Sequence, residues 1–201
     1  MQNILAIHGA FSSPRIFNFL HSQLSKKYAW NFFDYRTQTS GLHSIIKSIP
    51  TYQDVHVVGH SMGGLIALGI CNQPWVKSVS TIATPLGGVD VNFLQSYFTR
   101  SDFINDIASH GDFIKNLSKQ KYRCPIQHLI STAGFSPWLF EPNDGVVTLR
   151  SQRAFSLGKT IEIDANHAEI MLDSMTVKSL DNFWHLKNKD RKSTRLNSSH
   201  T

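Results

Sequence analysis

The stretch VVGHSMGGL, residues 57–65, constrains the fold most strongly, because it changes from the pattern of a buried strand to that of a helix. A single serine, Ser61, lies at this junction between Gly59 and Gly63. In a sharp turn from a strand into a helix, residues two positions apart nearly touch, so side chains there would clash. The spacing therefore predicts that the turn lifts Ser61 above a sheet as a nucleophile. The alternative is a serine that only caps a helix.

Strand-like and helix-like segments alternate along the chain, which predicts a parallel sheet covered by helices on both faces. Helices are expected between the strands, and a last one over about residues 168–186. We therefore expect one α/β domain over residues 1–186. Its six strands are predicted at residues 4–7, 30–35, 54–58, 76–83, 126–132 and 160–164.

Residues 87–123, between the fourth and fifth strands, form an excursion that is too long for a simple loop and too apolar for disorder. Its apolar residues pair at i, i+4 spacing, which predicts short amphipathic helices that form a cap. The pairs are Phe93-Leu94 with Tyr97-Phe98, Phe103-Ile104 with Ile107, and Phe113-Ile114 with Leu117.

The positive charge of the chain is concentrated at its end. Residues 187–201 hold five Lys and Arg and one Asp, which gives 5 − 1 = +4 of the total net charge of +6. This tail is polar and lacks apolar periodicity, so we expect it to be disordered and foreign to the native protein. Because the charge does not follow one face of the domain, no nucleic-acid partner is expected.

The two cysteines, Cys71 and Cys124, are too few for a disulfide framework and lack the spacing of metal ligands. We expect both to be free thiols or small buried residues, which suits a reducing compartment. No apolar run approaches the roughly 20 residues of a membrane span, and the N-terminus lacks the features of a secretory signal. A cytoplasmic protein without stable membrane insertion is expected.

A serine hydroxyl is a weak nucleophile, so a base must take its proton and a carboxylate must orient that base. In this architecture the chain order is Ser, then Asp or Glu, then His. Asp144 lies in the turn-rich loop after the fifth strand, and His167 follows the sixth strand. Both positions are at the carboxyl edge of the sheet. Asp144 also fits a simpler role within its own Asn-Asp-Gly turn, and the two roles are compatible.

The oxyanion of an acyl-transfer reaction needs two hydrogen-bond donors. The backbone N–H of Met62, directly after the nucleophile, is expected to be one donor. The second is expected from the loop after the first strand, at Ala10 or alternatively Phe11, with Gly9 allowing the backbone to turn. A plain turn at the end of the strand is the alternative.

Four separated motifs carry a family resemblance: HGAF at residues 8–11, GHSMGGL at 59–65, NDGVVT at 143–148 and NHAEI at 166–170. With ATPLGG at 83–88, they resemble the small lipase and esterase branch of the α/β-hydrolases. The resemblance implies a minimal form of that fold, without the two antiparallel strands that lead larger relatives. It also implies acyl-enzyme chemistry at Ser61 and a cap built from the excursion.

These observations predict a serine hydrolase that cleaves a small ester or lipid-like substrate and needs no metal or organic cofactor. Candidate substrate contacts are Phe11, His60, Trp138 and Leu139, although the aromatic residues of this region also suit packing of the cap. Acyl transfer or thioester hydrolysis would use the same triad. A binding protein without catalysis on the same fold is the third reading.

Overall fold

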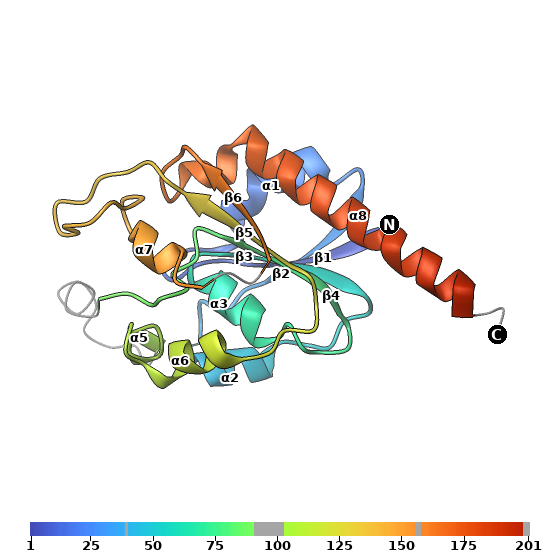
Figure 1. Cartoon of the computed structure of the whole chain (residues 1–201), viewed down its shortest axis with the longest axis horizontal. Coiled ribbons are helices and arrows are strands. Elements are labelled where there is room, and N and C mark those ends of the chain that lie inside the picture. The colour runs from blue at the N-terminus through green and yellow to red at the C-terminus, as the bar shows by residue number, and fades with distance from the viewer. Residues whose placement is uncertain (39, 91–102, 156–157, 199–201) are drawn as a thin grey trace.

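The computed structural model of the chain describes residues 1–38, 40–90, 103–155 and 158–198 (Figure 1). Six strands form one sheet in the order β2-β1-β3-β4-β5-β6, and each neighbouring pair is parallel. The predicted α/β class and its six strands are confirmed, and no strand of this sheet is antiparallel. The strands are β1 (Gln2–Ile7), β2 (Tyr28–Phe33), β3 (Val55–His60), β4 (Val76–Ile82), β5 (Ile126–Ser131) and β6 (Lys159–Ile163).

Helices cover both faces of the sheet (Figure 1). One face carries α2 (Leu42–Ser48), α3 (Met62–Gly69), α5 (Phe103–Asp106) and α6 (Asp112–Lys119). The other face carries the 3-10 turn η1 (Pro14–Phe17), α1 (Asn18–Leu24), η2 (Glu169–Leu172) and α8 (Ser174–Ser198). A short helix that the sequence did not predict, α7 (Leu149–Gln152), follows the loop after β5.

The core consists of two hydrophobic clusters, one on each side of the sheet. The central strand β3 is buried over its whole length, and its neighbouring residues Val57 and Val58 belong to different clusters. This alternation follows from the period of two in a strand. On the α8 side, Trp184 is fully buried. The sheet is thus the rigid middle layer from which the loops at its carboxyl edge extend.

The excursion is described in part, since Phe93, Leu94, Tyr97 and Phe98 lie outside the described residues. Helix α6 confirms the amphipathic helix predicted around Phe113, because the apolar side chains of its pattern are buried. One contact within the segment and one contact to the body help to hold it. A short parallel bridge joins Val89 to Ala108, and the Leu42 N–H at the start of α2 donates to Asp106 Oδ2 at 2.6 Å.

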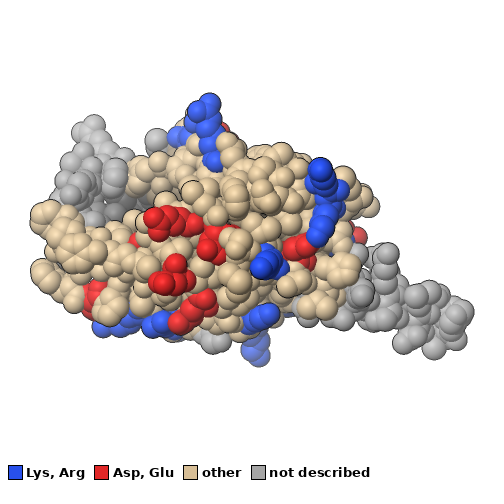
Figure 2. Space-filling model, turned by 90° about the horizontal axis from the view of Figure 1, so that it is seen from above, with Lys and Arg blue, Asp and Glu red and all other residues tan. Residues whose placement is uncertain are grey.

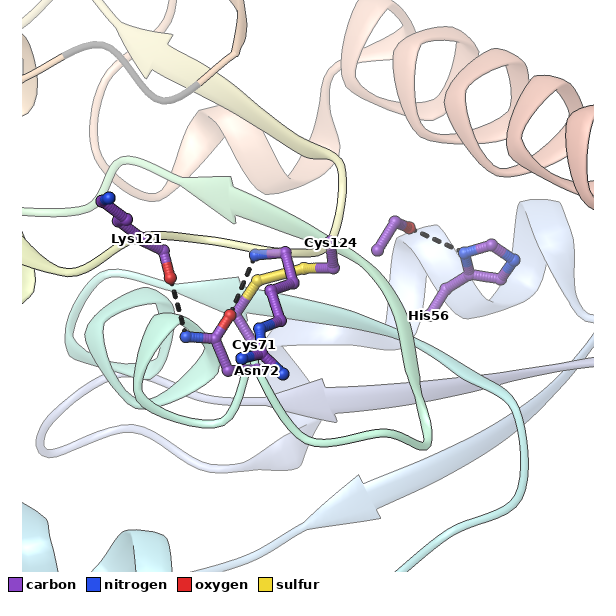
Figure 3. Close-up of a disulfide and its surroundings, with 7 residues drawn as sticks. His56, Cys71, Asn72, Lys121 and Cys124 are labelled. Carbon is purple, nitrogen blue, oxygen red and sulfur yellow. Dashed lines mark hydrogen bonds between the residues drawn. A yellow bond between two sulfur atoms is a disulfide. The ribbon is translucent and has the colours of Figure 1, made fainter.

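The expectation of free thiols is wrong, because Cys71 and Cys124 form a disulfide (Figure 3). Helix α3 runs back along the sheet, so its end reaches the edge at which β5 begins. A sequence separation of 53 residues hides this proximity. The disulfide also removes the cysteine argument for a reducing compartment, since disulfides persist mainly in oxidising ones.

The final helix differs from its predicted extent of residues 168–186. It is divided into η2 and α8, and the Asp173 carboxylate between them accepts the Met175 N–H at 2.6 Å. Beyond residue 186, where disorder was expected, α8 continues to Ser198. No Gly or Pro interrupts this stretch, and Lys and Arg favour helices. None of the helices in the described ranges combines the length and the hydropathy that a membrane span requires.

Candidate active site

The turn between β3 and α3 holds Ser61 in an unusual backbone conformation, with φ at 53° and ψ at −126°. A non-glycine residue rarely adopts a positive φ, and such strain persists only where the surroundings impose it. Here the Ser61 N–H donates to the Ile82 carbonyl of β4 at 2.8 Å, and the Ser61 carbonyl accepts the Gly64 N–H at 2.9 Å. The predicted elbow is therefore built by the backbone of neighbouring elements.

The two glycines of the elbow are needed because backbone atoms pass where their side chains would lie. A Cβ on Gly59 would come within 2.2 Å of the Gly63 carbonyl oxygen. A Cβ on Gly63 would come within 2.1 Å of the Ile7 carbonyl oxygen at the end of β1. The crowding predicted from the sequence is confirmed, and it extends from the elbow to the neighbouring strand.

Asp144 and His167 are in direct contact, with 2.7 Å between His167 Nδ1 and Asp144 Oδ2. The Asp144 side chain is buried and accepts several other hydrogen bonds. Its Oδ2 accepts from the Ser131 hydroxyl at 2.5 Å and from Gln152 Nε2 at 2.9 Å, and its Oδ1 accepts the Val147 N–H at 2.7 Å. Asp144 therefore serves both its own turn and His167, as the two compatible readings allow.

These contacts fix the charge of Asp144. Burial alone would raise the pKa of its carboxyl group, but the hydrogen bonds and positive potential of His167, with those from Ser131 and Val147, outweigh burial and lower the pKa. The carboxylate is therefore ionised at neutral pH. An ionised carboxylate only accepts hydrogen bonds, so His167 Nδ1 carries a proton.

Ser131 and Gln152 are functional candidates that the sequence did not reveal. Ser131 ends β5 and Gln152 ends α7, and both are buried against the Asp144 carboxylate. The sequence predicted the strand but not the short helix, so nothing indicated that an amide would lie beneath this loop. The two residues complete the shell that holds Asp144 in place.

The loop after β1 differs in detail from its prediction. Gly9 was expected to allow a turn, but the positive φ, 53°, belongs to Phe11. Gly9 is needed for space instead, because a Cβ there would lie 3.0 Å from Ser61 Cβ and 3.4 Å from His60 Nδ1. The loop that contains Ala10 therefore packs directly against Ser61.

His8 holds this loop from beneath. Its ring is buried and stacks on Tyr35 with 4.2 Å between the centroids. His8 Nδ1 lies 2.8 Å from the Gly9 carbonyl oxygen, and the Tyr35 hydroxyl donates to the His8 carbonyl at 2.7 Å. Asp34 Oδ1 lies 3.3 Å from His8 Nε2. The sequence placed His8 in this turn without indicating these contacts.

A cavity of about 1180 Å³ opens beside the elbow. The order of the strands reverses between β1 and β3, and ligands of open α/β sheets bind outside the carboxyl ends of the strands at such a point. The lining of the cavity is largely apolar and includes the exposed side chains of Phe11, Trp138 and Phe140. The lining includes most of the predicted site residues: Ala10, Phe11, His60, Ser61, Met62, Trp138, Leu139 and His167.

Ser61 and His167 share this cavity, but within the described residues no hydrogen bond from the Ser61 hydroxyl is recorded. In unliganded enzymes such hydrogen bonds are often long and tighten only when the substrate binds. In the same ranges, no group of three or more His, Cys, Asp or Glu side chains is arranged to hold a metal ion. The arrangement thus offers a strained serine, an oriented imidazole and an apolar cavity.

Neither known protein-family models nor curated proteins match the sequence. Solved structures do match across most of its length. The mature lipase BlEst2 of Bacillus licheniformis has a TM-score of 0.67 and 18% identity, over 92% of this chain and 91% of that one. A lipase-esterase related protein from Clostridium acetobutylicum has a TM-score of 0.64 and 14% identity, over 90% and 94%.

A third match is the mouse α/β hydrolase domain-containing protein 10, with a TM-score of 0.61 and 18% identity over 93% of this chain and 90% of that one. At these identities the likeness concerns the fold. The parallel sheet and the elbow after β3 agree with it. The chain therefore has the α/β-hydrolase fold.

Proposed function

We propose that this protein is a serine hydrolase that cleaves carboxylic esters through an acyl-enzyme on Ser61. The observation that carries the proposal is the 2.7 Å contact of His167 Nδ1 with the buried Asp144 carboxylate, made by an imidazole that shares a cavity with the strained serine. A mere turn aspartate would not need a histidine partner.

The proposed chemistry follows from the tautomer of His167 that carries a proton on Nδ1. In the neutral imidazole, a proton on Nδ1 toward Asp144 leaves His167 Nε2 with a free lone pair that can take the Ser61 proton. The serine oxygen then attacks the ester carbonyl, and the imidazolium returns its proton to the leaving alcohol. Water attacks the acyl-enzyme in the same way, with His167 again as the base.

The negative oxygen that forms during each attack needs donors. The N–H of Met62 begins α3, where the partial positive charge of the helix end also favours an anion. The N–H of Ala10 is the proposed second donor, from the loop that packs against Ser61. The apolar lining favours an uncharged acyl group.

The overall positive charge gives little support to a nucleic-acid function. On the face seen in Figure 2, Asp and Glu gather near the middle, and Lys and Arg lie mostly around them. Nucleic-acid surfaces typically have a continuous basic patch. The mixed pattern on this face favours a small-molecule substrate.

The test is hydrolysis of nitrophenyl esters and acyl thioesters of graded chain length by wild type, Ser61→Ala and Asp144→Asn. Triad serines typically contribute about 10⁶-fold to turnover, so Ser61→Ala should reduce kcat to background. Asp144→Asn would favour the wrong tautomer of the His167 imidazole and should lower kcat roughly 10⁴-fold. Ser118→Ala is the matched control, because this serine is exposed on α6.

An organophosphonate probe adds an independent readout. Mass spectrometry should find the label on Ser61 in wild type and in Ser118→Ala, and no label in Ser61→Ala. Preference for thioesters would favour the thioesterase alternative. Near-full activity of Ser61→Ala, or no labelling of a folded wild type, would contradict the proposed mechanism.

A further inference from the structure

The imidazole of His60 has no role in the chemistry proposed above, although it lies inside the site. His60 is the last residue of β3 and directly precedes Ser61. Its side chain is buried, and its ring centroid lies 4.9 Å from that of His167. From the sequence it was expected to contact substrate. Its hydrogen bond indicates a different role.

His60 Nε2 lies 2.9 Å from the backbone carbonyl oxygen of His167. A carbonyl oxygen only accepts, so Nε2 must carry the proton of the His60 ring. Burial, followed by the positive potential of His167, lowers the pKa of His60 from 6.5 to about 3, so the ring is neutral. Its Nδ1 is then a bare acceptor, and it has no partner among the residues that the structure describes.

The bond from His60 completes the fixation of His167. On one side, the His167 N–H donates to the Asp144 carbonyl at 2.9 Å, and the ring contacts the Asp144 carboxylate. On the other side, the His167 carbonyl accepts from His60. The backbone of the base is thus held between the loop after β5 and the end of β3.

We propose that His60 is a positioning residue that sets the place of the His167 imidazole relative to Ser61. The inference rests on the proposed function. Because His60 and Ser61 are consecutive, the hydrogen bond ties the base to the residue next to the nucleophile. Loss of this tie would let the loop of His167 move away, and a misplacement of 1 Å can cost about 100-fold in rate.

Three substitutions of His60 distinguish the positioning role from a role in packing or in substrate contact. His60→Phe keeps an aromatic ring but removes the donor, His60→Asn has an amide that is too short, and His60→Gln has an amide that reaches the position of Nε2. We expect Phe and Asn to lower kcat by about 10- to 100-fold and Gln by no more than about threefold. KM should change by less than about threefold in all variants, because the lost bond is to His167 and not to substrate.

The matched control is His56→Gln, in the same strand. His56 is fully buried, and its Nδ1 lies 2.7 Å from the Ser78 hydroxyl (Figure 3). Its ring also packs beside Trp184 of α8. This variant should lower the melting temperature without changing kcat of the folded enzyme. His60→Phe should instead lower kcat of the folded enzyme, because it removes the hydrogen bond to the His167 carbonyl.

The outcomes distinguish the two proposals. If wild type lacks esterase activity that depends on Ser61, the proposed function fails. If wild type is active, the role of His60 is overturned by full kcat in His60→Phe, by equal loss in Gln and Asn, or by a change confined to KM. Rescue by Gln alone, at unchanged KM, supports the inference.

Discussion

The disulfide between Cys71 and Cys124 gives the sharpest prediction about stability. It closes a loop with a sequence separation of 53 residues, which includes β4, α5 and α6. In the chain-entropy relation, a loop of this length removes roughly 14 cal/mol/K from the unfolded chain, or about 4 kcal/mol at 25 °C. The variant Cys71→Ser/Cys124→Ser should be less stable by this amount. Its melting temperature should fall by about 10 °C.

The loss should come mainly from the unfolded state, because other contacts hold the same junction. The Asn72 side chain donates to the Lys121 carbonyl at 2.8 Å and accepts the Arg123 N–H at 2.9 Å (Figure 3). Neither bond involves a cysteine. Esterase activity of the folded variant at 25 °C should therefore equal that of wild type.

The assay is urea unfolding followed by circular dichroism, with wild type and variant each measured with and without a reducing agent. Reduced wild type should approach the midpoint of the variant, and the variant should not respond to the reductant. Thiol titration of the unfolded, unreduced wild type should find no free thiol. Equal free energies of unfolding for unreduced wild type and variant would refute the entropic reasoning, and two free thiols would refute the disulfide itself.

Two other substitutions test the fold around the site. Gly63→Ala would force a Cβ against the Ile7 carbonyl, so we expect destabilisation by about 3 kcal/mol or more. Gly69→Ala meets only the end of the Ile46 side chain, and its cost in thermal unfolding should be smaller. Burial lowers the pKa of His128 from 6.5 to about 4, so only the unfolded state takes up this proton between those pH values. The free energy of unfolding should therefore fall by about 3 kcal/mol as pH drops from 6.5 to 4. In His128→Gln, chemical unfolding at the same two pH values should show a fall that is smaller by about this amount.

The sheet and the pairing of Asp144 with His167 were predictable because local patterns determine them. A strand such as β3 is apolar throughout, and the elbow needs glycine at two fixed positions. Chain order then assigns the acid and the base. Parallel strands bring their carboxyl ends to one edge, so residues 144 and 167 can meet without any sequence signal for distance.

Contacts between distant segments were not predictable in this way. Nothing in the sequence near Cys71 indicates that α3 ends beside the start of β5. Ser131 gave no signal for its role because its partner Gln152 lies on a helix of only four residues. His60 belonged to a recognised motif, but its bond to a carbonyl 107 positions away depends on the folded loops.

The bridge between Val89 and Ala108 brings together the two ends of residues 90–107 of the excursion. The Val89 N–H donates to the Ile107 carbonyl at 2.9 Å, and the Ser109 N–H donates to the Val89 carbonyl at 3.0 Å. Val89, Ile107 and Ser109 also line the cavity. A foreign segment grafted between these points would start and end in backbone that is already paired, and doubling its length would cost only about 0.6 kcal/mol. Exchange of the segment between Val89 and Ala108 is thus a way to rebuild one wall of the cavity while leaving the sheet and the elbow unaltered.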